Sequence, residues 1–170
     1  MEKIFNSKMI CGRSFINRFR IDKNKVNSIR YSISWDGIEW EEECSILSDI
    51  KHPMKLDMVN IEDLGTYHEI LVVVLSKHNG ISTVTLATSI GGNIWFSQKL
   101  LDSVELGVDE IKKLRIVRNV DFINIYISCI KNGKKIAYVI QIKDHVLKEA
   151  LERREYKDHL KVSYEIYPLE

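Results

Sequence analysis

The chain has 170 residues, of which 45% are hydrophobic and 29% are charged, and its formal net charge is +1. This composition is typical of one globular domain, residues 1–170, that buries roughly 70% of its unfolded surface. A charge so near zero argues against a nucleic-acid or membrane-surface partner, and the longest aliphatic run, residues 70–75, is too short to cross a bilayer.

The N-terminal residues show no secretory signal pattern. Cys11, Cys44 and Cys129 are odd in number and lack CxxC spacing, which is typical of reduced thiols. We therefore expect a cytoplasmic protein.

In the first third of the chain, strands are expected at residues 8–13, 15–21 and 26–34. The second of these places Phe15 and Phe19 on one face, and the third alternates into a turn at Asp36-Gly37. Residues 48–63 contain Pro53 and have mixed polarity, so they are expected to be a connection.

The middle third begins with a nearly continuous aliphatic stretch at residues 69–76, which predicts a strand buried on both faces. Asn79-Gly80 predicts a tight hairpin that leads into a strand at residues 81–89. After a second glycine turn, a strand is expected at residues 94–100.

In the last third, residues 106–113 are expected to be a linker or a short helical turn. Strands are predicted at residues 114–117, 122–130 and 135–142, with a hairpin tip at Asn132-Gly133.

The chain then departs from this strand pattern. Asp144 is a plausible N-cap for a helix that continues to about residue 157, with a narrow apolar stripe that docks on the β body. Residues 160–167 are expected to form the last strand.

Two stretches of the sequence, residues 31–40 and 86–95, repeat one another. The shared positions are Ser34 with Ser89, Gly37 with Gly92, and Trp40 with Trp95. Together with the two Asn-Gly tips, they divide the chain into three units of roughly 54 residues, at about 1–48, 54–104 and 110–170. Repetition at this period predicts supersecondary units that bury a face against one another.

Ser34 to Trp40 reads S-x-D-G-x-x-W and resembles the Asp-box (BNR-type) hairpin of β-propeller blades, in a form one residue shorter than the sialidase motif. The resemblance covers residues 30–43 and, with Gly91 in place of the aspartate, residues 86–97. It implies an all-β fold, with one C-terminal helix, of three four-stranded propeller-like blades, which is half of a six-bladed ring. A β-trefoil or a β-prism is the alternative, because both close within one chain of this length.

In the family that it resembles, the Asp box is a structural turn and carries no catalytic residue. The residues expected to have this structural role are Ser34, Asp36, Gly37, Trp40 and Trp95. Both tryptophans are large apolar groups that suit the space between two packed sheets, so we expect them in the core.

Charge is distributed unevenly along the chain. Residues 1–30 carry eight Lys or Arg and two acids, a net of +6, whereas residues 31–69 carry two and ten, a net of −8. This pattern would be explained by strands of opposite charge that pair within one unit or bind one subunit to the next. The alternative is an anion-binding surface, whose residues would be Arg13, Arg18, Arg20 and Arg30. Trp35, in the turn itself, is the aromatic residue expected to be exposed, where it could stack on a sugar.

No motif for a metal, a phosphate cradle or a nucleophile elbow occurs, and the five histidines are scattered. We therefore expect a non-enzymatic binding or assembly module without cofactor or metal, which oligomerises with itself as a homodimer. The alternative is a carbohydrate-binding, lectin-like module that takes a glycan or an anionic ligand.

Overall fold

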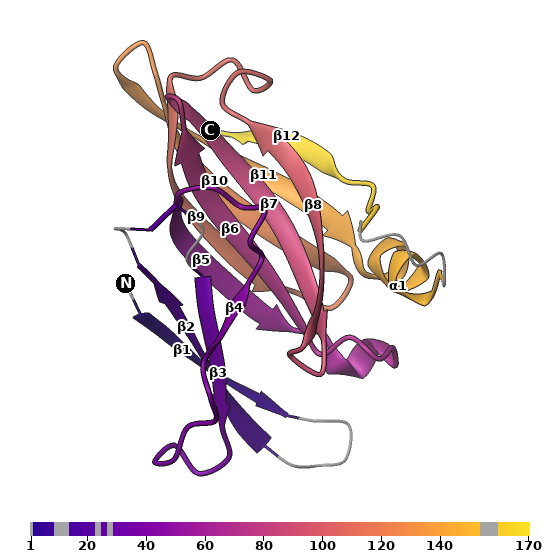
Figure 1. Ribbon diagram of the computed structural model, residues 1–170. Helices are drawn as coiled ribbons and strands as arrows, with labels where there is room; N and C mark the ends of the chain where they lie inside the picture. Colours follow the sequence, from indigo (N-terminus) through magenta and orange to yellow (C-terminus); the bar gives the residue numbers. More distant parts are fainter. Residues whose placement is uncertain (1, 9–13, 23–24, 27–28, 154–159) are drawn as a thin grey trace.

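The computed structural model describes the chain except for residues 1, 9–13, 23–24, 27–28 and 154–159 (Figure 1). Its described residues form three four-stranded antiparallel sheets, each made of consecutive strands. The first sheet comprises β1 (Glu2–Lys8), β2 (Ser14–Ile21), β3 (Ile29–Ser34) and β4 (Cys44–Ile46). The second comprises β5 (Pro53–Asn60), β6 (Ile70–His78), β7 (Ile81–Ile90) and β8 (Ile94–Asp102). The third comprises β9 (Glu110–Arg118), β10 (Phe122–Lys131), β11 (Lys134–Lys143) and β12 (Glu165–Leu169).

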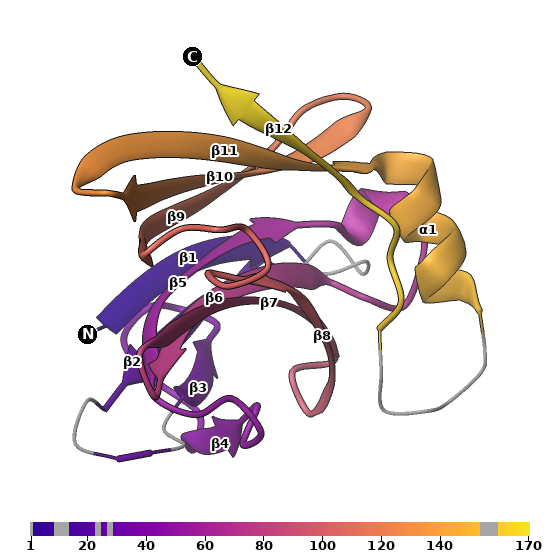
Figure 2. The ribbon, with the colours of Figure 1, turned by 90° about the horizontal axis from the view of Figure 1, so that it is seen from above.

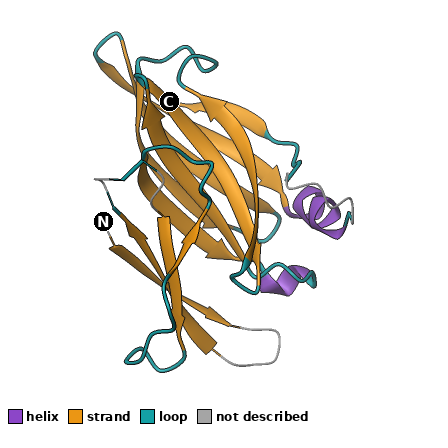
Figure 3. Ribbon diagram, viewed as in Figure 1, coloured by secondary structure: helices purple, strands orange, loops and turns teal. Residues whose placement is uncertain are grey.

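One α-helix, α1 (Asp144–Glu152), and a short 3-10 helix, η1 (Glu62–Leu64), complete the described elements (Figure 3). The expectation of a mostly β protein with one C-terminal helix is therefore confirmed. No helix in the described part of the chain is long and apolar enough to cross a membrane.

The second sheet lies between the other two (Figure 2). Alternate residues of β6 point to opposite faces of the sheet. Ile70 and Val72 therefore join the core shared with the first sheet, while Leu71 and Val73 join the core shared with the third. This is the physical basis of the aliphatic run, and the prediction of a strand buried on both faces is confirmed.

Both Asn-Gly hairpins form as predicted. Asn79 and Gly80 have φ of 49° and 81°, and Asn132 and Gly133 have φ of 48° and 72°. Two successive residues with positive φ are what a type I′ hairpin turn requires. These turns fix the registers of β6 with β7 and of β10 with β11.

The helix docks on the β body, as expected, through Leu147, which is fully buried between the second and third sheets. The chain returns from it along β8. There Val162 donates its N–H to Oε1 of Gln98 at 2.7 Å, and Gln98 Nε2 donates to the Val162 carbonyl at 3.0 Å. Residues 160–164 thus fill the space between these two sheets, and β12 begins only at Glu165 rather than at residue 160.

The prediction that residues 48–63 form a connection is wrong, because β5 occupies most of them. Leu56 and Met58 alternate into the core. Pro53 stands at the first position of the strand, where a missing N–H is tolerated.

Three smaller expectations also fail. The first strand is at residues 2–8 rather than 8–13, and residues 9–13 lie outside the described part. Residues 106–113 are not all linker, because β9 starts at Glu110. Asp144 is the first helical residue rather than the N-cap, since its carboxylate binds Arg118 instead of the backbone of α1.

Candidate functional site

The two repeated turns share one hydrogen bond. The Gly37 N–H donates to the hydroxyl of Ser34 at 2.8 Å, and the Gly92 N–H donates to the hydroxyl of Ser89 at 2.8 Å. Both glycines have positive φ, 78° and 73°, which a glycine adopts without steric cost. The sequence repeat is therefore a repeat of turn geometry.

Asp36 adds a second set of bonds to the first turn. Its carboxylate accepts the N–H groups of Ile38 at 2.8 Å and Glu39 at 2.9 Å, and the Ser34 hydroxyl at 3.1 Å. These bonds lower the pKa of Asp36, the two backbone N–H groups most of all. The carboxylate serves its own turn, so Ser34, Asp36 and Gly37 all act on local structure.

The prediction that both tryptophans lie in the core is wrong for Trp40, whereas Trp95 packs against the core shared by the first and second sheets. Trp95 is half-buried: it packs at the edge of the first core, 5.5 Å from the ring of Tyr31, and donates its Nε1–H to the Gly92 carbonyl at 2.9 Å. Trp40 is half-buried on the outer side of the first sheet. Trp40 precedes β4 and is not part of the strand. Its ring lies over the sheet surface, with the Arg18 guanidinium 4.1 Å from the ring centre.

The expected arginine surface is only partly assembled. Arg13 lies outside the described residues. Arg18 and Arg20 share the outer side of the first sheet, opposite buried Phe15 and Phe19. Arg20 forms an ion pair with Glu43, and Arg18 donates to the Ser32 hydroxyl at 3.1 Å.

These arginines therefore already have partners in their own chain. The Arg20–Glu43 pair shows complementary charge tying the first sheet together, which is the simpler of the two interpretations of the charge pattern.

Trp35 is exposed as expected, with 46% of its surface accessible. Its ring packs 5.7 Å from Phe15, and its Nε1–H donates to Glu41 at 3.0 Å. The ring is thus held in one orientation with a free face.

Sequence reasoning missed the outer face of the third sheet. In β10, Ile123, Ile125 and Ile127 point into the core, while Tyr126 points away and is 38% exposed. In the register of the sheet, Tyr126, Val139 and Tyr167 form one row, and Tyr167 is 43% exposed. Val139, between the two rings, is only 8% exposed, and neither of the two hydrophobic cores of the described residues includes this row. The signal was present in the alternation of residues 122–130, but alternation alone does not say which face stays open.

The same sheet is strongly basic. Residues 110–143 contain eight Lys or Arg and two acids, a net of +6. A groove of about 580 Å³ opens at its hairpin end, and the residues lining it include Lys55, Lys112, Lys113, Lys135, Ala137 and Leu169. Among the described residues, none forms an ion pair with Lys113 or Lys135. This face therefore combines exposed aromatic rings with uncompensated positive charge, which suits an acidic partner surface.

Within the part of the chain that the structure describes, no group of three or more His, Cys, Asp or Glu is placed to hold a metal ion. No protein-family model matches the chain, and searches of curated proteins and of solved structures found no match either.

Proposed function

We propose that the chain is a non-enzymatic assembly module of propeller-like blades that binds a second copy of itself head to tail. The open face of the third sheet of one copy, which bears Tyr126 and Tyr167, binds the first sheet of another copy at its acidic edge, residues 31–49. One observation supports this most: the second sheet is covered on both faces, whereas the third has only one face covered. An uncovered face with exposed aromatic side chains is a common interaction surface.

Charge complementarity favours a second copy as the partner. Residues 31–49 contain six acids and no Lys or Arg, against the net of +6 on residues 110–143. Figure 2 shows β4 and β12 at opposite sides of the molecule, with the second sheet between them. The two charged regions cannot meet within one chain. They can meet between chains.

An interface between different faces of two identical chains is heterologous, so it either closes a ring or continues as a filament. Two copies of three blades each would close a six-bladed ring, which is the arrangement that the Asp-box resemblance implies. The paired arginines of the first sheet do not oppose this contact, because Arg20 is neutralised by Glu43 and Arg18 lies against Trp40.

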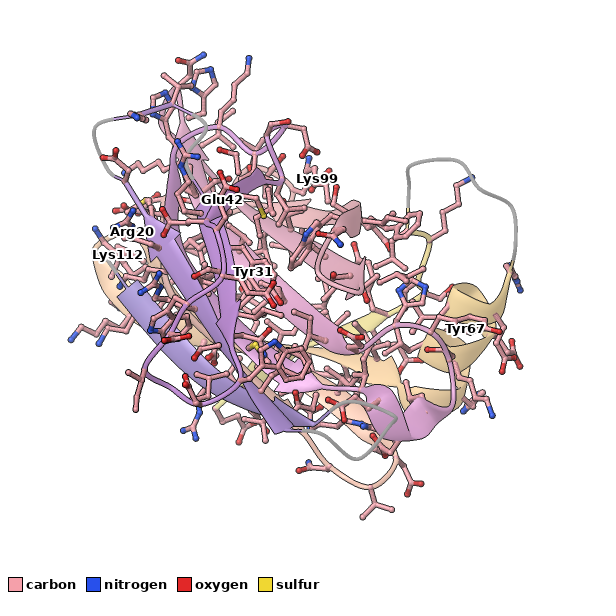
Figure 4. All side chains as sticks on the ribbon, turned by 60° about the horizontal axis from the view of Figure 1, so that its bottom comes forward. Arg20, Tyr31, Glu42, Tyr67, Lys99 and Lys112 are labelled. Carbon is pink, nitrogen blue, oxygen red and sulfur yellow. The ribbon has the colours of Figure 1, made fainter. Side chains whose placement is uncertain are left out.

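The solution mass by light scattering tests the proposal. The wild-type chain is expected at twice 19.8 kDa or a higher multiple. The double variant Tyr126→Glu/Tyr167→Glu should fall to 19.8 kDa, since it places two negative charges on the face that receives the acidic edge. Tyr67→Glu is the control: Tyr67 is 77% exposed, and Figure 4 shows it on the side of the molecule opposite Lys112. A wild-type chain that stays at 19.8 kDa at every concentration contradicts the proposal.

Carbohydrate binding is the second candidate, and the fixed orientation of the exposed Trp35 ring favours it. A flat ring with one free face can stack on a sugar. Binding to a glycan array that is lost in Trp35→Ala would support this function, and an array without signal would count against it.

A further inference from the structure

A second cavity lies where the connection between β4 and β5 crosses the second sheet. It measures about 270 Å³ and is away from the open face of the third sheet. Its floor is formed by side chains of β6, β7 and β8, and its wall by residues 49–51. The lining residues that bear hydrogen-bonding groups are Asp49, Lys51, Ser76, His78, Thr83, Thr85, Ser97 and Lys99.

Three hydroxyl groups on the floor form no hydrogen bond with another described residue: those of Ser76, Thr83 and Thr85. Ser76 and Thr85 are each only 7% exposed. None of these oxygens is an enclosed, unpaired atom, so all three reach the open space of the cavity, where a ligand hydroxyl can replace bound water. The floor is therefore ready to bind a polar molecule.

The sheet sets the spacing of these hydroxyls. Ser76 is directly opposite Thr83 in the register of β6 and β7, and Thr85 is opposite Lys99 on β8. Opposite Cβ atoms on neighbouring strands are about 5 Å apart, and residues two apart on a strand are separated by about 7 Å. A small ring with hydroxyls at several carbons spans such distances.

The charges of the cavity are balanced. Asp49 accepts the hydroxyl of Ser97 at 3.3 Å. Lys99 is paired with Asp102 at 2.6 Å and with Glu105 at 3.2 Å. The cavity thus offers both donors and acceptors without a strong net field, which suits a neutral ligand better than an anion.

The wall of the cavity is held in place from two sides. His52 donates its N–H to the Val26 carbonyl at 2.7 Å and accepts the Lys77 N–H at 3.2 Å. Its ring is stacked on that of His78, with centroids 5.2 Å apart. The site is therefore shaped before a ligand arrives, which reduces the entropic cost of binding.

We propose that this cavity binds a neutral, polyhydroxylated small molecule of the size of one monosaccharide. Ser76, Thr83 and Thr85 would bind the ligand hydroxyls from below, and Asp49 and Lys51 from the side. The lining of the site includes neither Trp35 nor a residue of the third sheet, and it shares only Asp49 with the acidic stretch of residues 31–49. Lys51 lies outside that stretch, so its variant separates ligand binding from self-assembly.

The test is an NMR titration of the full chain with D-glucose, D-galactose and D-mannose, and separately with inorganic phosphate. At least one hexose is expected to shift amide signals of β6, β7 and residues 49–52, with millimolar affinity. Thr83→Val and Lys51→Ala should each weaken binding at least fivefold, whereas Ser128→Ala, which removes an exposed hydroxyl on the third sheet, should leave it unchanged.

Because Lys51 is exposed on a connection, its variant keeps the test valid if Thr83→Val fails to fold. Three results would overturn the proposal: no hexose binds, only phosphate binds, or both site variants bind the hexose as the wild type does. The solution mass of Lys51→Ala should equal that of the wild type, so a failure here is distinct from a failure of self-assembly.

Discussion

The second and third sheets have the same four-stranded antiparallel layout but different surroundings. In β6, residues 70–76 are all buried, because each face of the second sheet meets another sheet. In β10, buried isoleucines alternate with the outward-facing Tyr126 and Ser128. The position of a sheet in the stack therefore determines which of its residues tolerate substitution. It also determines which face is free to bind a partner.

The largest expected effect follows directly from this difference. The side chains of Ile70 and Leu71 point to opposite faces of β6. Ile70→Ala and Leu71→Ala should each lower the unfolding free energy by about 2–5 kcal/mol. Ile125→Ala should cost a similar amount, but its neighbour Tyr126→Ala less than about 1 kcal/mol. Urea unfolding of these four variants, each made in a chain that does not self-assemble, measures the four losses of unfolding free energy. An equally large loss for Tyr126 would show that the outer face is covered within the chain.

The two repeated turns differ in how closely other side chains surround their glycines. A Cβ at Gly92 would lie 2.7 Å from the Tyr31 ring, which Phe19 and Trp95 confine. A Cβ at Gly37 would meet only the end of the Ile16 side chain, at 3.2 Å. Positive φ alone costs an alanine about 1–2 kcal/mol. We expect about that loss for Gly37→Ala and about 3 kcal/mol or more for Gly92→Ala in thermal or urea unfolding. Equal losses would refute the close contact at Gly92.

Arg118 joins the second sheet, the third sheet and the helix. It forms ion pairs with Asp63 and Asp144 and donates to the Asn60 carbonyl at 3.1 Å. Arg118→Ala should lower the unfolding free energy by about 2 kcal/mol, because it leaves the half-buried Asp144 without its partner. Arg115→Ala, an exposed arginine of the same strand, should change it by less than about 0.5 kcal/mol.

The smallest expected effect is a pH dependence from His68, which is buried in the segment that precedes β6. The Thr88 hydroxyl donates to the Ile70 carbonyl at 2.9 Å, so its oxygen accepts the Nδ1–H of His68 at 3.1 Å. Burial lowers the pKa of His68, so below its ordinary value of 6.5 the unfolded chain binds the proton more readily than the folded chain. Stability should fall as the pH falls below about 6.5, by at most about 1.4 kcal/mol per pH unit. His68→Gln should remove this part of the slope in urea unfolding between pH 7 and pH 5. An unchanged slope would mean that other groups cause it.

The local features of this fold were predictable from sequence because they depend on neighbouring residues. The Asn-Gly pairs determine their hairpins through positive φ, and Ser34 and Ser89 determine matching turns through one hydrogen bond three residues ahead. The aliphatic run of β6 identified the sheet that is buried on both faces.

The predictions that failed concern features that depend on contacts between segments distant in sequence. β5 was missed because Pro53 and polar residues obscured the alternation of Leu56 and Met58. Trp40 looked like a core residue, but its surroundings are set by Arg18 on another strand. The open face of the third sheet and the cavity above β6 to β8 follow from the stacking order of the sheets, which no local pattern contains.

A mixing experiment tests head-to-tail assembly most directly. One variant, Lys113→Glu/Lys135→Glu, alters the open face, and the other, Glu39→Lys/Glu42→Lys, alters the acidic edge. Each alone is expected at 19.8 kDa by light scattering, because its two contact surfaces now carry the same sign of charge. Their 1:1 mixture should return to at least twice that mass, since each variant then meets a surface of opposite charge. Variants that keep the wild-type mass, or a mixture that stays monomeric, would contradict assembly through these two surfaces.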